Sequence, residues 1–340
     1  MSRNICAQFI PSNDPIIKRV PLLELREPGL YCPAGDFYID PVAPVDRALV
    51  THAHSDHAYP GSRAYLAARA GQLLLRERLG ADASIQPVDY GEPLTLGGVR
   101  VSFHPAGHIL GSAQIRLEQD GEVWVVSGDY KLDPDPTCAP FEPIRCHTFV
   151  TESTFGLPIF RWPAESETIA AIHAWWRANQ EAGKPSLLYA HALGKAQRLL
   201  ARIDSAIGPI HASESVERWN AIYRGQGIAL APTASTPDWR RALIVAPPSS
   251  QVVASRFSQA STALASGWMR IRGTRRRQSL DRGFVFSDHA DWPALLRAID
   301  ETRAATVWVT HGYRTPLVRW LHEHGRQAMA IAAPLPEAAS

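Results

Sequence analysis

The sequence predicts an α/β protein in which a strand-rich domain is interrupted by a smaller second domain. The first half consists mainly of short β-branched or aromatic runs bounded by Gly, Pro or Asp, a pattern typical of strands. After residue 160, helical and apolar stretches alternate, which indicates an α/β unit. The strand-rich pattern returns near the end. We therefore expect one domain from residues 1–156 and 286–340, with an inserted domain at 157–285.

The strand-rich region contains one predicted helix and one predicted hairpin. Strands are predicted at 37–42, 47–52, 98–106, 113–119, 122–129 and 147–154. Asp120-Gly121 lies between two of these runs and predicts a tight hairpin turn. The stretch 61–80 has apolar residues at helical spacing and ends at Gly80, so we predict a helix there.

The inserted region and the C-terminal region alternate between helices and strands. Helices are predicted at 165–184, 194–207 and 292–304, with a last helix after 312. Apolar strands are predicted at 185–191, 241–250, 282–287 and 306–312. The end of the chain, 330–340, is predicted to be a frayed tail.

Composition excludes several classes of protein. The 340 residues are 45% hydrophobic and 20% charged, with a formal net charge of +2, so any affinity for nucleic acid must come from a local patch. Cys6, Cys32, Cys138 and Cys146 show no C-x-x-C spacing, which argues against a disulfide framework or a zinc ribbon. The N-terminus lacks a signal-peptide pattern, and no apolar run is long enough to span a membrane. We expect a cytoplasmic protein with no membrane partner.

The segment "THAHSDHAYPG" places His52, His54, Asp56 and His57 within six positions. In extended backbone, residues two apart point the same way, so His52 and His54 can bind one ion together. Asp56 and His57 lie where the chain turns and can serve a second ion. A solvated histidine-rich loop is the alternative, but tight His/Asp spacing after an apolar strand favours a metal site.

Further candidate ligands follow other predicted strands. His108 lies in the glycine-rich turn "HPAGHILGS", Asp129 follows "VWVVSG", and His311 follows "TVWVT". We assign His52, His54 and His108 to one divalent ion, and Asp56, His57 and His311 to another, with Asp129 able to bridge them. Asp40 is expected to orient a ligand imidazole. A lone His108 or His311 would more often be structural, so these assignments depend on the cluster at 52–57.

The motifs H-x-H-x-D-H, G-H, S-G-D and the late T-H-G, in this order, resemble the metallo-β-lactamase fold. The resemblance implies a four-layer αββα sandwich with a binuclear site between its sheets. It is specific because the six-residue motif occurs together with all the later ligands. Two divalent ions, Zn²⁺ or Mn²⁺, would generate hydroxide at neutral pH and stabilise the charge that builds on phosphate oxygens, which suits attack on a phosphodiester.

Two further segments resemble the β-CASP branch of this fold, nucleases that carry an inserted cap domain. They are "FVTESTFG", with Glu152 at a strand end, and "FVFSDHAD", with His289 before a helix. The resemblance implies that Glu152 orients His289, which acts as the general acid for the leaving group. The alternative is that this segment only caps the following helix, through Asp288 or Asp291. We assign Asp56, Glu152 and His289 to catalysis.

Basic residues supply candidate phosphate contacts. The stretch "MRIRGTRRRQSLDRG" is strongly basic and lies just before the His289 segment. Lys195 and Arg198 stand at a probable helix start, although a solvated helix face is an equally good interpretation. The predicted nucleic-acid-binding residues are Lys195, Arg198, Arg270, Arg272, Arg275, Arg276 and Arg277.

Over nearly the whole chain these segments resemble the bacterial ligase-associated DNA exonucleases. This resemblance implies a DNA exonuclease that acts in DNA repair with a DNA ligase and a helicase. In β-CASP enzymes, however, histidine in the late motif is typical of RNA-specific members, and His311 occupies that position. A ribonuclease that processes RNA ends is therefore the alternative.

Two other classes of function fit less of the sequence. A hydrolase of small thioesters or lactams leaves the inserted domain, the arginine cluster, Glu152 and His289 unexplained. A nucleic-acid-binding subunit without activity does not explain the full ligand set. The sequence does not distinguish 5′ from 3′ polarity, exonuclease from endonuclease action, or the preferred strand state.

Overall fold

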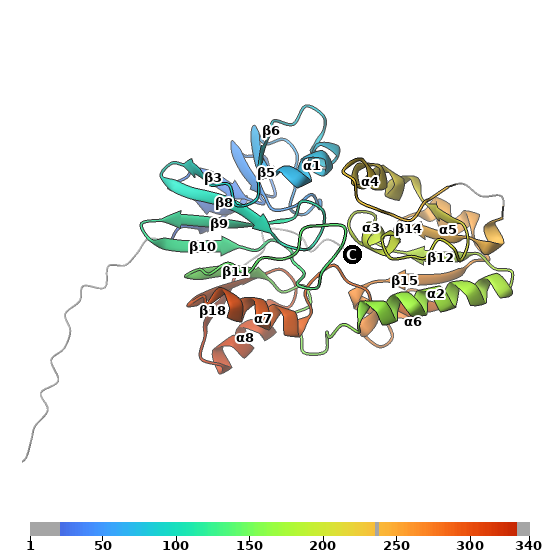
Figure 1. Cartoon of the computed structure of the whole chain (residues 1–340). Coiled ribbons are helices and arrows are strands. Elements are labelled where there is room, and N and C mark those ends of the chain that lie inside the picture. Colours follow the sequence, from blue (N-terminus) through green and yellow to red (C-terminus); the bar gives the residue numbers. More distant parts are fainter. Residues whose placement is uncertain (1–20, 235–237, 332–340) are drawn as a thin grey trace, which may run out of the picture.

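The computed structural model describes residues 21–234 and 238–331 (Figure 1). It confirms the α/β class, with three sheets among the described residues. Two of the sheets form one part of the molecule, and the third sheet forms a second part beside it. Cys6 and most of the predicted tail at 330–340 lie outside the described residues.

The first sheet has six strands in the order in which they occur in the chain. β1, β2 and β3 pair antiparallel, and β3 to β6 pair parallel. The strands are β1 (Glu24–Arg26), β2 (Gly29–Cys32), β3 (Phe37–Ile39), β4 (Arg47–Val50), β5 (Ala64–Ala68) and β6 (Ile85–Val88).

The second sheet has seven strands in the order β18-β17-β11-β10-β9-β8-β7. Its strands are β7 (Leu94–Leu96), β8 (Val99–Pro105), β9 (Ala113–Gln119), β10 (Glu122–Val126), β11 (Thr148–Glu152), β17 (Thr306–Thr310) and β18 (Gln327–Ala330). The predicted hairpin is confirmed: β9 and β10 are antiparallel, and both Asp120 and Gly121 have the positive φ that such a turn requires. β10, β11, β17 and β18 are parallel, so their carboxyl ends meet at one edge.

Three apolar clusters establish the order of the layers. Leu49 of the first sheet and Phe103 of the second lie in one buried cluster, so these two sheets pack face to face. The outer face of the second sheet, including Val307, packs on α7 and α8. The outer face of the first sheet, including Val50, packs on α1. The helices are α1 (Gln72–Leu79), α7 (Trp292–Thr302) and α8 (Arg314–Glu323), with a short 3₁₀ turn η1 (Arg69–Gly71) before α1.

The third sheet is parallel throughout, in the order β13-β14-β12-β15-β16. Its strands are β12 (Ser186–Tyr189), β13 (Ile210–Ala212), β14 (Leu243–Ala246), β15 (Ser261–Ala265) and β16 (Arg282–Phe284). The accompanying helices are α2 (Glu165–Glu181), α3 (Lys195–Leu200), α4 (Glu214–Gly225), α5 (Gln251–Arg256) and α6 (Thr274–Arg277), with η2 (Trp239–Arg241) and η3 (Gly267–Arg270). Ile172 and Trp176 of α2 pack on one face of this sheet.

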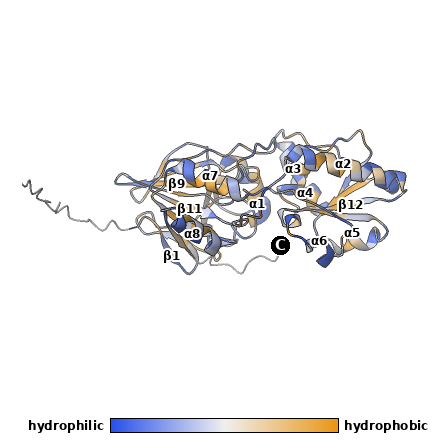
Figure 2. Ribbon diagram, turned by 90° about the horizontal axis from the view of Figure 1, so that it is seen from below, coloured by the Kyte–Doolittle hydropathy of each residue, from blue (hydrophilic) through white to orange (hydrophobic). Residues whose placement is uncertain are grey.

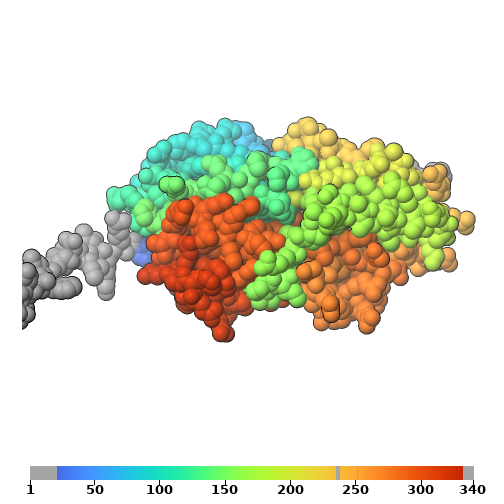
Figure 3. Space-filling model, turned by 60° about the horizontal axis from the view of Figure 1, so that its bottom comes forward, coloured from blue at the N-terminus to red at the C-terminus, as the bar shows by residue number. Residues whose placement is uncertain are grey.

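Every strand of the third sheet comes from residues 186–284. On this basis we propose the division made from the sequence, with residues 157–285 as an inserted cap and the remainder as a two-sheet domain. Figure 3 shows two lobes, and the chain near residue 160, in green, crosses between them. The lobes also meet where the Leu110 N–H donates to the Tyr223 hydroxyl of α4, at 3.2 Å.

Two predicted elements differ from the structure, and some observed elements were not predicted. The predicted helix at 61–80 is wrong in its first half, because 64–68 form β5, which pairs with both neighbouring strands and so overrides the helical spacing. The predicted helix at 194–207 is only six residues long, ending at Leu200. β18 was not predicted, because the mostly exposed Gln327–Ala330 lacks the apolar pattern of a strand. These residues form a strand because they pair with β17.

No helix among residues 21–234 and 238–331 is both long enough and apolar enough to cross a lipid bilayer.

Candidate metal centre

The predicted ligands come from strand ends that meet between the two sheets and the cap. His52 to His57 follow β4, Asp129 follows β10, and His311 follows β17. His108 follows β8 in a turn at Gly107, whose φ is +74°. A Cβ at that glycine would lie 2.2 Å from the carbonyl oxygen of Lys131, so only glycine allows the two segments to approach this closely.

Four buried side chains form the first group of ligand atoms. His54 Nδ1 lies 3.0 Å from His52 Nε2 and 3.1 Å from His108 Nε2. Asp129 Oδ2 lies 3.5 Å from His52 Nε2 and 3.8 Å from His108 Nε2. Ligands about 2.1 Å from a tetrahedral zinc ion lie about 3.4 Å from one another. The spacing therefore fits a single divalent ion.

Hydrogen bonds fix which nitrogen of each ring is free to bind a metal. His108 Nδ1 donates to the carbonyl of Asp288 at 2.8 Å, and His54 Nε2 donates to the carbonyl of Leu193 at 3.2 Å. A carbonyl only accepts, so each of these ring nitrogens carries the proton. The opposite nitrogen, His108 Nε2 or His54 Nδ1, then presents a lone pair to the ion.

The ring of His52 is oriented through Thr51. The Thr51 hydroxyl donates to Asp40 at 2.5 Å and can therefore accept from His52 Nδ1, which lies 3.1 Å away. Asp40 also accepts from His57 Nδ1 at 2.7 Å. Asp40 thus contacts the ring of His57 and the hydroxyl that supports the ring of His52, an arrangement expected of a carboxylate that orients candidate ligand imidazoles.

The remaining candidates form a second group beside the first. His57 Nε2 lies 3.5 Å from Asp129 Oδ2 and 3.8 Å from Asp56 Oδ2. The rings of His57 and His311 stack with centroids 5.2 Å apart. His57 Nε2 and His311 Nε2 are both buried nitrogens without a hydrogen-bond partner. Buried polar atoms are rarely left unpaired, so these two nitrogens fit a second ion that shares Asp129.

Burial and nearby carboxylates shift the pKa values of the candidate ligand histidines in opposite directions. Burial lowers the pKa of His52, His54 and His108, which keeps these imidazoles neutral, the form that binds metal. His57 differs: burial lowers its pKa, but Asp129, Asp56 and Asp40 outweigh burial and hold the pKa well above its usual value.

Glu152 and His289 form a pair at the side of the first group. His289 Nδ1 donates to Glu152 Oε2 at 3.0 Å, and the Tyr130 N–H donates to Glu152 Oε1 at 2.8 Å. The ring of His289 lies 4.6 Å from the ring of His108. Burial lowers the pKa of His289, but Glu152 and Asp129 outweigh burial and raise it to about 9. A protonated imidazole here can donate a proton near neutral pH.

The helix-capping alternative for this segment applies to a different residue. Asp291 accepts from the Ala294 N–H at 3.0 Å and caps α7. The carboxylate of Asp288 instead pairs with Lys195 of the cap, with Nζ and Oδ1 3.1 Å apart. Capping therefore leaves His289 free for the role that the resemblance implies.

The structure adds contacts from the cap that the sequence did not reveal. Besides the Leu193 carbonyl, the ring of His191 packs against the ring of His54 with centroids 4.8 Å apart. His191, Leu193 and Asp288 were not predicted as parts of the site. Only Asp288 had a visible signal, since it adjoins His289.

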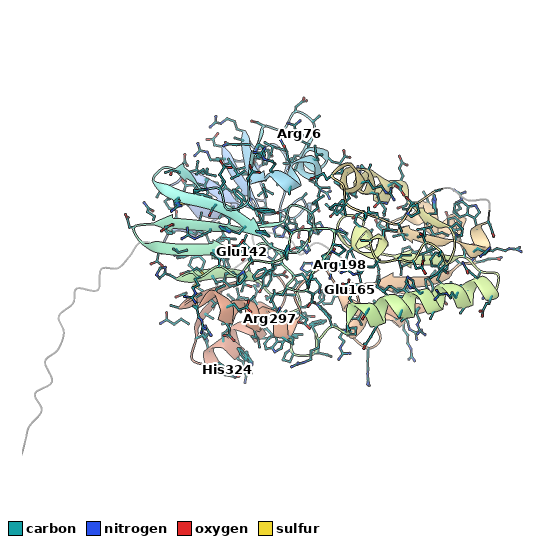
Figure 4. All side chains as sticks on the ribbon, viewed as in Figure 1. Arg76, Glu142, Glu165, Arg198, Arg297 and His324 are labelled. Carbon is teal, nitrogen blue, oxygen red and sulfur yellow. The ribbon has the colours of Figure 1, made fainter. Side chains whose placement is uncertain are left out.

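Arg198 was predicted to contact nucleic-acid phosphate, and the structure argues against this role. Its side chain is 1% exposed and donates to Asp135 Oδ2 at 2.9 Å and to Glu165 Oε2 at 2.7 Å. In Figure 4, Arg198 and Glu165 lie close together where the two lobes meet. Asp135 belongs to the two-sheet domain, so Arg198 joins the cap to that domain.

Replacing Arg198 is expected to destabilise the protein strongly. Arg198→Met leaves the buried carboxylate of Asp135 without its main partner, which costs about 3–5 kcal/mol. Urea unfolding measures this loss. Arg319→Met, which removes an exposed pair with Glu323, is the control and should leave the unfolding midpoint unchanged. Equal midpoints for the two variants would contradict the assignment.

The predicted arginine cluster lies on α6 and in the segment before it. Arg270, Arg272, Arg275, Arg276 and Arg277 are all exposed. In Figure 2, α6 is strongly hydrophilic. The cluster follows Trp268, whose ring lies 4.9 Å from that of Phe155, and the ring of Phe155 lies 5.8 Å from that of His289. Trp268, two residues before Arg270, is thus linked to His289 through two ring contacts.

These observations define a class of protein: two facing sheets, a buried cluster of histidine and aspartate that can hold metal, and a third sheet whose segments contact that cluster. The predicted resemblance is confirmed, since the chain is related to the metallo-β-lactamase-fold, β-CASP-type nucleases. No family model matches the chain.

Particular relatives support this relation. The chain is 30% identical over 310 residues to a probable DNA ligase of Opitutus terrae. This match covers 89% of this chain and 30% of that protein. It is 26% identical over 209 residues to an RNase J-like protein of Methanocaldococcus jannaschii, covering 53% of this chain and 50% of that protein. It is 30% identical over 143 residues to ribonuclease TTHA0252 of Thermus thermophilus, and this match covers 33% of this chain and 32% of that protein. The chain spans at most half the length of these relatives.

Proposed function

We propose that this protein is a metal-dependent phosphodiesterase that cleaves nucleic acid. The observation that carries this proposal is the Glu152–His289 pair beside the ligand cluster, with the two imidazole rings of His289 and His108 4.6 Å apart. A hydrolase of small thioesters or lactams does not require a second, separate proton donor of this kind together with a cap and an exposed arginine cluster.

The proposed chemistry divides between the ions and the side chains. Two divalent ions, Zn²⁺ or Mn²⁺, would supply activation of water and stabilisation of charge on the phosphate. His52, His54 and His108 would hold one ion, Asp56, His57 and His311 the other, and Asp129 both. His289 would donate a proton to the leaving oxygen, and Glu152 would hold the His289 ring in the orientation that allows this.

The substrate would be bound by the cap. Lys195 is 13% exposed on its side chain and lies beside Asp288, next to the ligand His108. Lys195 and the exposed arginines at 270–277 are the proposed phosphate contacts, with Arg198 removed from the set.

We propose DNA as the preferred substrate, cleaved from an end. A relative whose match covers 89% of this chain is named a probable DNA ligase, and that match covers 30% of the relative. A nuclease unit within a protein that is named as a ligase fits a role in preparing DNA ends for joining. This supports DNA as the substrate. A DNA ligase and a helicase of the same repair pathway are the proposed partners, and the cytoplasm is the proposed location.

A ribonuclease that processes RNA ends is the second candidate. His311 lies beside His57, where the family pattern associates histidine with RNA. Several relatives carry names of RNA enzymes, including the endoribonuclease ysh1 of Aspergillus fumigatus, 32% identical over 123 residues that cover 35% of this chain and 14% of that protein.

One assay separates the two candidates. Single and duplex strands of the same sequence, made as DNA and as RNA and labelled at the 5′ or the 3′ end, are digested with Zn²⁺ or Mn²⁺. The proposal expects faster release of nucleotides from DNA. Faster cleavage of RNA would replace DNA with the second candidate, and the labelled end that is lost first gives the polarity.

Removing charge from α6 is expected to weaken nucleic-acid binding in a salt-dependent way. Each arginine that neutralises one phosphate contributes about 1 to the slope of log K against log salt concentration. Arg276→Gln/Arg277→Gln should therefore lower the magnitude of the slope by about 2, as measured by fluorescence anisotropy. Arg297→Gln/Arg319→Gln, which removes two exposed arginines from the helices behind the second sheet, is the matched control. An equal slope in both double variants would remove α6 from the proposed surface.

A further inference from the structure

The cap segment from His191 to Lys195 contacts the candidate ligand His54 and pairs with Asp288, the residue that orients His108. This segment leads from β12 into α3 and reaches into the two-sheet domain. It contacts His54 directly and His108 through Asp288. We propose that this segment positions the metal ligands, so that closure of the cap and binding of the first metal ion strengthen each other.

The direct contacts are the hydrogen bond from His54 Nε2 to the Leu193 carbonyl, at 3.2 Å, and the packing of the His191 ring against the His54 ring. Of His52, His54 and His108, only His54 uses the ring nitrogen that faces away from the proposed ion to bond to the cap. Thr51 and Asp288, which bond to the other two rings, belong to the two-sheet domain. Without Leu193, a buried ring N–H would lose its partner, and the Nδ1 lone pair would no longer be fixed on the ion.

The second contact passes through Asp288. Lys195 Nζ lies 3.1 Å from Asp288 Oδ1, and the carboxylate of Asp288 is 2% exposed. The carbonyl of the same residue accepts from His108 Nδ1 at 2.8 Å. The ion pair therefore ties the residue that orients His108 to the first helical residue of α3.

Gly194 sets how closely the segment approaches. Its φ is +88°, and a Cβ at this position would lie 2.3 Å from Cγ2 of Ile109, the residue after His108. The next atom of that side chain, Ile109 Cβ, would lie 3.4 Å away, an ordinary contact. A methyl group at 194 thus forces the segment and the ligand loop apart, and removing the Ile109 side chain beyond Cβ relieves most of that collision.

Coupling between two binding events is reciprocal by thermodynamic necessity. If the cap segment favours the ligand geometry that binds metal, then bound metal must favour the closed position of the cap segment by the same factor. The inference therefore makes one prediction about the metal and another about the cap. Neither requires a substrate.

The first experiment measures hydrogen exchange of the full chain, stripped of metal, with and without added Zn²⁺. The inference expects Zn²⁺ to slow exchange of the backbone amides at 191–200 in the cap, although every proposed ligand belongs to the two-sheet domain. Unchanged exchange in this segment, together with protection of the ligand loop at 51–58, would overturn the inference.

The second experiment measures Zn²⁺ affinity by competition with a chelator. Gly194→Ala should weaken binding of one ion by about tenfold, the lower range for loss of a group that orients a metal ligand. Ile109→Ala alone should bind nearly as the wild type does. The double variant should bind more tightly than Gly194→Ala, because the collision is relieved while the strain at φ +88° remains.

Gly227→Ala is the control for backbone strain. Gly227 also lies in the cap, has a φ of +81°, and a Cβ there would meet nothing within 4 Å. Wild-type affinity in Gly194→Ala, or an equal loss in Gly227→Ala, would overturn the inference. The inference rests on the proposed metal centre and not on nuclease activity. A chain that binds Zn²⁺ and protects the cap but cleaves nothing would contradict only the proposed function.

Discussion

Asp129→Ala is expected to abolish cleavage while leaving the protein folded. Asp129 Oδ2 lies within 3.8 Å of candidate ligand nitrogens in both groups, so its removal would take one ligand from each proposed ion. Because the ions would supply both the activation of water and the stabilisation of phosphate charge, we expect the rate to fall by more than about 10³-fold. Metal content per chain, measured by elemental analysis, should fall below two in the same preparation.

The control for this variant is Asp46→Ala. Asp46 is an exposed aspartate of the same domain that pairs only with the exposed Arg63 among the contacts of the described residues. It should keep full activity and full metal content. Circular dichroism shows whether Asp129→Ala stays folded. Undiminished cleavage by a folded, metal-free Asp129→Ala protein would refute the role of the metal centre.

His289→Ala is expected to slow cleavage by about 10²–10⁴-fold, the range typical for loss of a general acid. His289 donates to Glu152 and lies outside both ligand groups as assigned, so metal content should remain at the wild-type level. This combination of lost rate and retained metal distinguishes a proton donor from a ligand. Retained rate, or lost metal, would contradict the assignment.

Glu152 is expected to act through His289, and a double variant tests this relation. If Glu152 only orients and charges the His289 ring, Glu152→Gln should add little to the effect of His289→Ala. A double variant that is slower by the product of the two single effects would give Glu152 an independent role. His322→Ala on the outer helix α8 is the matched control for loss of a histidine.

The candidate ligands could be proposed from the sequence because each is recognisable from short-range features. Each one follows an apolar strand, and the carboxyl ends of β10, β11 and β17 meet at one edge of a parallel arrangement, so strand order brings Asp129, Glu152 and His311 together. The Asp40 contact was predictable for the same reason, since Asp40 directly follows β3, which pairs with β4.

The contacts of the cap were not predictable in the same way. Leu193 contributes a backbone carbonyl, which leaves no trace in residue type, and its partner His54 lies 139 positions earlier. Arg198 looked like an exposed helix-start cation, but packing of the cap on the two-sheet domain buries it between Asp135 and Glu165. Local spacing carries no information about either contact, because both depend on how the two parts of the chain meet.

One measurement tests the central claim most directly, that a two-ion centre in this chain cleaves nucleic-acid phosphodiesters. The full chain is stripped of metal and mixed with end-labelled DNA, and Zn²⁺ or Mn²⁺ is added in steps. The account predicts no cleavage at the start and a rate that rises and reaches its plateau at two ions per chain. Cleavage by the stripped chain, or no cleavage of DNA or RNA at any concentration of either metal, would contradict it.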